Sequence, residues 1–219
     1  MNAQRIISYL DHTLLNQAAT EKDIIKVCEE IIRYPFASLC IRPCHVGFCA
    51  QYLNGRAAIT SVAGFPFGTN NTHVKAFEAA AAVEAGASEI DMVLNIGALK
   101  DKRYDFCQND IREVVKAAAG AKVKVIIETC LLTQDEKRAA CDIIMNAGAH
   151  FVKTSTGFAG GGATVEDIAL LRKCVGSEFG VKAAGGIRTL QDCINMIAAG
   201  ANRIGTSSAV RIAEEALSQ

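Results

Sequence analysis

Charged side chains interrupt three short apolar segments of this chain, and they are the residues whose chemistry is most informative. Asp91 lies in EIDMV, Lys153 in FVKTS and Lys182 in GVKAA. Burial of a charge costs free energy unless the group is paired or used, so each residue forms a structural ion pair, extends to the rim of the fold or takes part in chemistry. We take all three as candidate catalytic residues.

The two lysines together suggest a nucleophile. One strand–helix unit separates Lys153 from Lys182, and consecutive parallel strands of a barrel lie about 4.8 Å apart. In a dry site, like charge and desolvation both lower the pKa of a lysine, which leaves one of the two as a free amine at neutral pH. Such an amine forms a Schiff base with a carbonyl compound, and Asp91 can move the protons, directly or through a water molecule. These arguments leave open which lysine is the nucleophile.

The segments that position these residues share a repeated Ala-Gly-Ala joint. The joints span residues 85–87, 147–149 and 199–201. Each joins an Ala-rich amphipathic stretch to a short apolar segment, and its glycine is typical of a helix C-cap that precedes a strand. The fourth residue after each joint is Asp91, Lys153 or Gly205. The joints therefore predict these three residues at equivalent places in three strands.

Five further apolar runs complete a set of eight predicted strands. They are SYLDH near residue 10 and the segments 37–41, 58–63, 122–128 and 180–184. Helical periodicity fills the intervals, and four predicted helices begin after threonine N-caps. These caps are Thr20, Thr133, Thr164 and Thr189.

The alternation of strands and helices predicts parallel strands with right-handed crossovers. Eight units in 219 residues favour an α/β fold, a single-domain (β/α)8 TIM barrel over residues 1–219. A doubly wound sheet is the alternative, but no GxGxxG motif follows the first strand.

The loops after the last two predicted strands are candidates for anion binding, because TIM barrels often bind phosphate there. Gly185 and Gly186 would let backbone amides approach an anion closely. Gly205, Ser207 and Ser208 are expected where the last helix begins and its positive end points outward. The alternative is that these residues form only turns and ordinary caps.

Composition narrows the class of partner. Half of the residues are hydrophobic, 21% are charged, and 23 basic residues balance 23 acidic ones, which gives no basic patch for nucleic acid or an anionic membrane. No apolar run is long enough for a membrane span. Nine scattered cysteines favour a reducing, cytoplasmic location. Histidine and cysteine spacings match no metal motif, so we expect a small-molecule partner and no metal or other cofactor.

Motifs along nearly the whole chain resemble those of the bacterial deoxyribose-phosphate aldolase family. They are DHTLL, ASLCIRP, EIDMVLNIGALK, VIIETCLLT, FVKTSTGF, VKAAGGIRT and RIGTSS, from about Asp11 to Ser208. The resemblance implies a TIM-barrel class I aldolase without a metal. Such an enzyme reversibly cleaves 2-deoxy-D-ribose 5-phosphate to acetaldehyde and D-glyceraldehyde 3-phosphate, in deoxyribonucleotide catabolism.

The same resemblance assigns roles to residues. It implies that Lys153 is the Schiff-base lysine, that Lys182 lowers its pKa and that Asp91 is the acid/base group. Together with the anion loops, the expected substrate contacts are Asp11, Thr13, Thr156, Gly157, Gly185, Gly186, Gly205, Ser207 and Ser208. Two rival functions stay open, a sugar-phosphate isomerase or synthase without a covalent adduct and a non-catalytic sugar-phosphate binder. The assembly also stays open, with a homodimer as one form.

Overall fold

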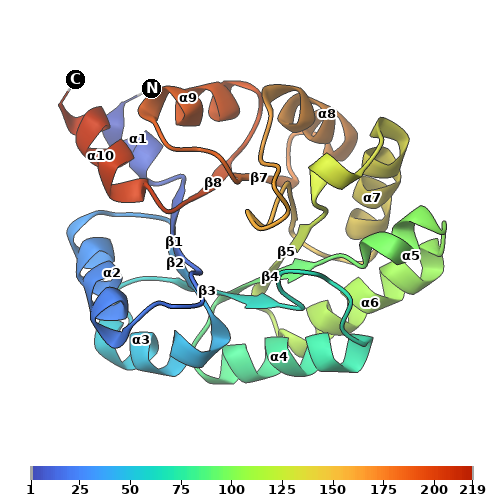
Figure 1. Ribbon diagram of the computed structural model, residues 1–219, viewed down its shortest axis with the longest axis horizontal. Helices are drawn as coiled ribbons and strands as arrows, with labels where there is room; N and C mark the ends of the chain where they lie inside the picture. The colour runs from blue at the N-terminus through green and yellow to red at the C-terminus, as the bar shows by residue number, and fades with distance from the viewer. Residues whose placement is uncertain (1, 219) are drawn as a thin grey trace.

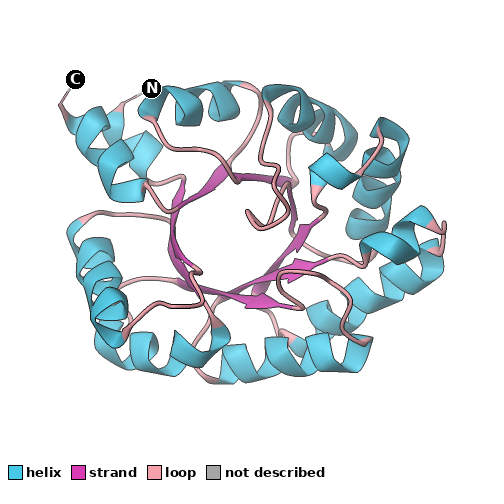
Figure 2. Ribbon diagram, viewed as in Figure 1, coloured by secondary structure: helices cyan, strands magenta, loops and turns pink. Residues whose placement is uncertain are grey.

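The computed structural model describes residues 2–218. Eight parallel strands pair in sequence order, and the last strand pairs with the first to close a barrel. Figure 2 shows the strands as a ring with the helices around it. The chain therefore adopts the (β/α)8 TIM barrel that the alternation predicts.

The eight strands occur where the sequence predicts them, with small shifts at their ends (Figure 1). The first begins two residues later than SYLDH, and the fifth ends two residues before Glu128. The strands are β1 (Leu10–Leu14), β2 (Ser38–Ile41), β3 (Ile59–Ala63), β4 (Glu89–Val93), β5 (Lys122–Ile126), β6 (Phe151–Lys153), β7 (Gly180–Ala184) and β8 (Arg203–Thr206).

Helices cover the outside of the barrel, and two short ones, α1 and α5, supplement the strand–helix alternation. The helices are α1 (Ala3–Ile7), α2 (Glu21–Arg33), α3 (Val46–Leu53), α4 (Thr72–Glu84), α5 (Ile96–Lys100), α6 (Tyr104–Ala117), α7 (Gln134–Asn146), α8 (Val165–Val175), α9 (Leu190–Ala198) and α10 (Ala209–Leu217). Over residues 2–218, none of them combines the length and the apolar character needed to cross a membrane.

The predicted helix ends are confirmed. All four threonine side chains accept a hydrogen bond from the backbone N–H three residues later, and three of them belong to full capping boxes. The glycines of the three joints, Gly86, Gly148 and Gly200, have φ values of 114°, 80° and 115°. Only glycine adopts such angles without strain, so each joint ends a helix and lets the next strand enter the barrel.

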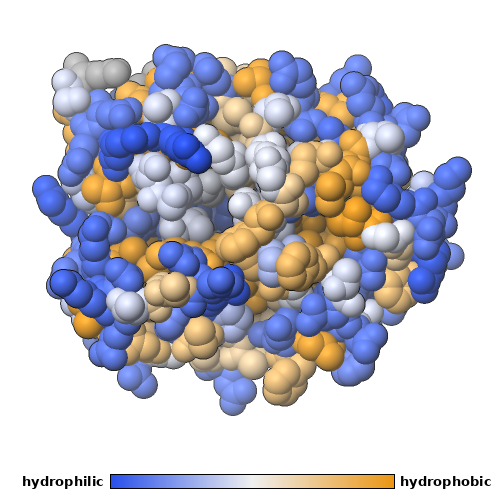
Figure 3. All heavy atoms as spheres, in the orientation of Figure 1, coloured by the Kyte–Doolittle hydropathy of each residue, from blue (hydrophilic) through white to orange (hydrophobic). Residues whose placement is uncertain are grey.

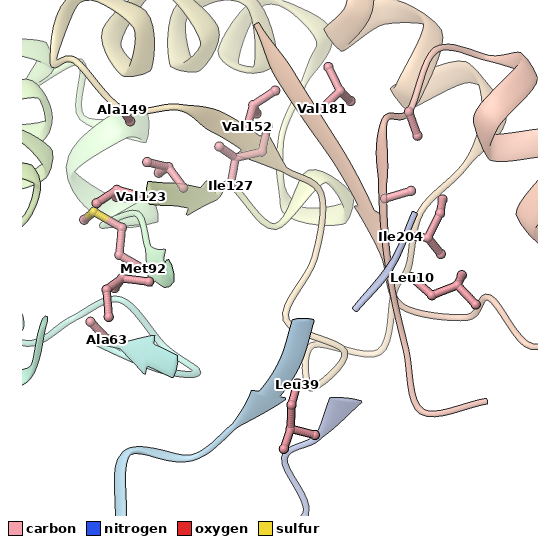
Figure 4. Close-up of a cluster of buried hydrophobic side chains, with 14 of the residues drawn as sticks. Leu10, Leu39, Ala63, Met92, Val123, Ile127, Ala149, Val152, Val181 and Ile204 are labelled. Carbon is pink, nitrogen blue, oxygen red and sulfur yellow. The ribbon is translucent and has the colours of Figure 1, made fainter. Parts of the chain in front are cut away.

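The apolar core lies between the strands and the helices. Because side chains alternate along a strand, the residues on the outward faces of the strands pack against the helices, as Figure 4 shows for Val152, Val181 and Ile204. The residues between them in sequence point inward. These inward positions carry acidic and basic groups where most barrels carry Val, Ile or Leu.

Candidate active site

Asp91 lies at the centre of the charged interior and contacts three lysines. Its Oδ2 accepts hydrogen bonds from Nζ of Lys153 and Nζ of Lys182, each at 2.7 Å. Its Oδ1 accepts one from Nζ of Lys124 at 2.8 Å. Strand pairing explains this gathering, since Asp91 is in register with Lys124, and Lys153 with Lys182.

A second set of charges lies around this group. Lys182 contacts a second carboxylate, that of Asp11. Oδ2 of Asp11 lies 2.6 Å from Nζ of Lys182. Arg203 contacts Oδ1 of Asp11 at 2.7 Å and both oxygens of Glu89, at 2.9 and 3.1 Å. Glu89 in turn lies 2.6 Å from Nζ of Lys124. The interior is therefore one connected network of ion pairs.

The network contains more basic than acidic groups. Four cationic side chains face three carboxylates, those of Asp11, Glu89 and Asp91. Among the described carboxylates, Lys182 contacts two, whereas Lys153 contacts one, that of Asp91, through an oxygen that it shares with Lys182. Of the two lysines that share Oδ2 of Asp91, Lys153 is therefore the one whose positive charge is less well compensated.

The pKa values follow from this arrangement. Burial lowers the pKa of Lys153, and the charge of Lys182 lowers it further, against the opposing effect of Asp91. Burial acts in the same direction on Lys182, but Asp11 and Asp91 outweigh it and raise the pKa of Lys182. Burial opposes ionisation of Asp91 as well, yet the three lysines hold its pKa well below the ordinary value. The site thus favours an Asp91 carboxylate and a Lys182 ammonium, and the ammonium of Lys153 gives up its proton more readily than that of an ordinary lysine.

A pocket of about 570 Å³ opens above the network, and Lys153 is the lysine that lines it. Figure 3 shows weakly polar and apolar residues meeting around a hollow near the middle of this face. Of the expected substrate contacts, seven line the pocket, namely Thr13, Thr156, Gly157, Gly185, Gly186, Gly205 and Ser207. Asp11, Asp91 and Lys182 lie beneath it and are fully buried. Ser208 instead lines an adjacent groove between α2 and α10.

The two anion loops differ in what their glycines do. Gly185 and Gly186 have φ values of 87° and 81°, so they form a turn that a larger residue would strain. Gly205 lies inside β8, not at the start of α10 as we expected. A Cβ there would stand 3.1 Å from Cε of Lys182, so Gly205 makes room for that side chain as it passes toward Asp91.

The loop after β6 is fixed by Glu128. This residue follows β5 in a left-handed conformation, with φ 49° and ψ 68°. Its Oε2 accepts hydrogen bonds from the backbone N–H of Thr156 at 3.1 Å and from Oγ1 of Thr156 at 2.5 Å. Glu128 thereby holds the loop that carries Thr156 and Gly157 at the pocket.

An aromatic wall closes the side of the pocket that Phe158 lines. The rings of Phe65 and Phe158 meet edge to face, with centroids 5.4 Å apart. The Arg42 guanidinium lies 5.9 Å from the centre of each ring, and its Nε donates to the backbone carbonyl of Leu15 at 2.9 Å. Arg42 therefore ties three separate loops together beside the site.

Sequence reasoning missed several members of the network. Lys124 and Glu89 lie in the apolar strands KVKVI and EIDMV, and the rule that singled out Asp91 applies equally to them. Arg203 stands in a strand of only four residues, RIGT, where its inward direction was not evident. Among residues 2–218, no three His, Cys, Asp or Glu side chains are grouped as a metal ion would require.

The proteins to which this chain is similar in sequence and fold are aldolases. A family model described as DeoC/LacD family aldolase matches residues 5–211. The chain is 58% identical over 221 residues to the deoxyribose-phosphate aldolase of Thermococcus kodakarensis, with 99% of each covered. It is 54% identical over 209 residues to that of Streptococcus sanguinis, with 95% of each covered. Among solved structures, it is similar to the deoxyribose phosphate aldolase of Aeropyrum pernix, described as a unique tetramer. The TM-score is 0.91 at 34% identity, and the match covers 98% of this chain and 92% of that one.

Proposed function

This chain belongs to the DeoC/LacD family of aldolases, and on that premise we propose that it cleaves 2-deoxy-D-ribose 5-phosphate through a Schiff base on Lys153. The observation that carries the proposal is the position of Lys153. Lys153 lines the pocket, whereas Lys182 lies beneath it. Lys153 also contacts one carboxylate of the network, whereas Lys182 contacts two. A lysine that lines the pocket and readily becomes neutral is the nucleophile that this chemistry needs.

In the proposed cycle, the neutral Nζ of Lys153 adds to the C1 aldehyde of the open-chain sugar phosphate to give a carbinolamine. Transfer of one proton from the Lys182 ammonium to its hydroxyl group and loss of one water molecule give an iminium ion. The bond between C2 and C3 then breaks as the C3 hydroxyl loses its proton. The electron pair of that bond moves toward the iminium nitrogen, so glyceraldehyde 3-phosphate leaves and an enamine of acetaldehyde remains. Protonation of the enamine at C2 gives a second iminium ion. Addition of water to this ion releases acetaldehyde and one proton, and it restores the neutral amine of Lys153.

Asp91 and Lys182 are the proposed groups for these proton transfers. The Asp91 carboxylate is an acceptor at rest, because its pKa lies well below the ordinary value. Oδ2 of Asp91 contacts Nζ of both lysines. A proton can therefore pass between Lys182 and the substrate-derived group on Lys153, at its C2 or at the C3 hydroxyl, along a path that excludes bulk water.

The 5-phosphate is proposed to bind at the loops after β7 and β8. Gly185, Gly186 and Ser207 line the pocket there, and Arg188 adds a guanidinium to the same wall. Loss of a charge-assisted contact costs about 1.5 to 3 kcal/mol, roughly ten- to a hundredfold in kcat/KM. We expect deoxyribose without the phosphate to be a poorer substrate by at least that factor, and Arg188→Met to reduce the difference.

Location and assembly are part of the proposal. All nine cysteines are free thiols, and Sγ of Cys28 lies 3.6 Å from Sγ of Cys49 without a bond, which supports a reducing, cytoplasmic compartment.

We propose a homodimer on the basis of Phe67 and Phe77, which are 74% and 73% exposed in the single chain. Cell fractionation tests the first point. Light scattering tests the second and distinguishes the dimer from a tetramer.

The decisive experiment traps the covalent intermediate. The protein is incubated with acetaldehyde, reduced with borohydride, and analysed by intact mass and peptide mapping. We expect one added ethyl group, located on Lys153, and no adduct in Lys153→Met. An adduct on Lys182 would overturn the assignment. Absence of any adduct in a folded, unmodified chain would favour an isomerase or a binder, which the comparisons do not support.

A further inference from the structure

Arg203 and Glu89 are charged side chains of the barrel interior that take no part in the proposed cycle and form no ion pair with its three residues, Lys153, Asp91 and Lys182. They form a bidentate ion pair with contacts of 2.9 and 3.1 Å. Neither lines the pocket that Lys153 borders, so neither touches the reacting atoms. We call them the floor pair. An ion pair this deep is expensive to bury and stabilises a fold only weakly, so its presence calls for another explanation.

The floor pair is connected to Lys153 through a short series of contacts. Arg203 contacts Asp11, Asp11 contacts Lys182, and Lys182 shares Oδ2 of Asp91 with Lys153. On the other side, Glu89 contacts Lys124, which donates to Oδ1 of Asp91. Both routes converge on the one carboxylate that Lys153 contacts.

The charge balance of the interior depends on both members of the floor pair. With every group ionised, four cations face three carboxylates and leave one positive charge in excess. Loss of one proton from Lys153 balances the network. Without Arg203 the network would balance with Lys153 still protonated. Without Glu89 it would stay positive even after Lys153 had lost its proton.

We propose that Arg203 and Glu89 are positioning residues whose opposite charges set the pH range in which Lys153 is a free amine. The inference rests on the proposed function of Lys153 and extends it to residues that never meet the substrate. According to this inference, the protonation state of Lys153 depends on the charge of the whole barrel interior and not on Lys182 alone.

Every strand contributes inward-facing polar side chains that must be included in the charge balance around Lys153. They are Asp11 on β1, Ser38 and Cys40 on β2, Thr60 on β3, Glu89 and Asp91 on β4, Lys124 on β5, Lys153 on β6, Lys182 on β7 and Arg203 on β8. Burial raises the pKa of the Cys40 thiol, so that group adds no charge near neutral pH. The hydroxyl groups are neutral as well, which leaves the balance to the acids and bases.

The size of the effect follows from strand spacing. Arg203 and Glu89 each lie two strands away from Lys153, which is roughly 10 Å. A unit charge at about that distance, in an effective dielectric of about 20, shifts a pKa by about one unit. The two members of the floor pair should shift it in opposite directions.

The test measures the rate of acetaldehyde adduct formation under borohydride against pH, together with kcat/KM. Its acidic limb reports the pKa of the nucleophile in the free enzyme. In Arg203→Met the limb should move up by about one pH unit, and in Glu89→Gln it should move down by about one unit. Arg203→Lys keeps the charge and should leave the limb in place. The double variant Arg203→Met/Glu89→Gln restores the balance and should return the limb to its original position.

The outcomes separate this inference from the proposed function. If the unmodified chain forms no adduct on Lys153, the proposed function fails. If it forms the adduct but all four variants keep the original limb and lose only rate or thermal stability, the floor pair is merely structural and the inference fails. Limbs that shift in the same direction for Arg203→Met and Glu89→Gln would overturn it too. If Arg203→Met does not fold, Arg203→Gln removes the same charge but keeps an amide N–H donor for Asp11 and Glu89, and its acidic limb should move up by the same amount.

Discussion

Replacement of Lys182 by methionine is the most direct perturbation of the nucleophile. Nζ of Lys153 and Nζ of Lys182 each lie 2.7 Å from the same oxygen of Asp91, so they are separated by at most twice that distance. Two unit charges about 5 Å apart repel by about 3 kcal/mol at an effective dielectric of about 20. That energy corresponds to about two pKa units. In Lys182→Met the repulsion disappears, and the pKa of Lys153 rises.

The sign of the effect on activity follows from the reactive form. Because the nucleophile is the free amine, activity falls as pH drops below the pKa of Lys153. A rise of about two units moves the acidic limb of kcat/KM upward by as much and reduces activity about a hundredfold at pH values below the original limb. Methionine keeps most of the length of the side chain, so packing over Gly205 is largely preserved.

The assay is the pH profile of kcat/KM for cleavage, with adduct trapping as a second readout. The acidic limb should move to higher pH, while the plateau rate falls because a proton-transfer group is lost. The shift should exceed that of Arg203→Met, because Lys182 lies one strand from Lys153 and Arg203 lies two. A large loss of rate with an unmoved acidic limb would refute the reasoning. Lys182 would then act only by transferring protons.

Three further predictions concern stability. The ion pair between Lys75 and Asp110 is 2.6 Å long and fully buried, so Lys75→Met should lower the free energy of unfolding in urea by about 3 to 5 kcal/mol; Lys75→Met/Asp110→Leu should restore most of it, and an equally unstable double variant would contradict this. Thr133→Ala removes a capping box and should cost about 1 kcal/mol in the same measurement, where an unchanged midpoint would show that the cap contributes nothing. Burial opposes ionisation of Asp11, but the ammonium of Lys182 and its other basic neighbours lower its pKa to about 2 from an ordinary 3.8. The stability that Asp11 contributes is therefore complete above about pH 4 and is lost as pH falls toward 2, about 2.5 kcal/mol in all; a thermal midpoint that stays constant over that range would be inconsistent with it.

The sequence was sufficient for the fold because its signals are local. A glycine joint is written in three consecutive residues, and a threonine cap needs only the residue three positions later. Joints such as the one at Gly148 and caps such as Thr133 repeat along the chain, and the structure confirms them. Repetition of one local unit eight times leaves few alternatives to a closed barrel.

The sequence also singled out three of the groups that meet at the centre of the barrel. Asp91, Lys153 and Lys182 stand out because a charge in an apolar strand is costly wherever the strand lies. The same rule could have found Lys124 and Glu89, in strands that were already recognised.

Only the closed barrel decides how these groups differ from one another. Lys153 and Lys182 look alike in sequence, because each is a lysine in a short strand. They differ in access to the pocket and in the number of carboxylates each contacts. The second carboxylate of Lys182 belongs to Asp11, in the first strand, which comes close only when the last strand pairs with the first. Electrostatic energy sums over every charge in the interior regardless of sequence distance. For that reason the sequence identifies each charged residue of a strand separately, whereas the tertiary structure determines which of the two lysines is the better nucleophile.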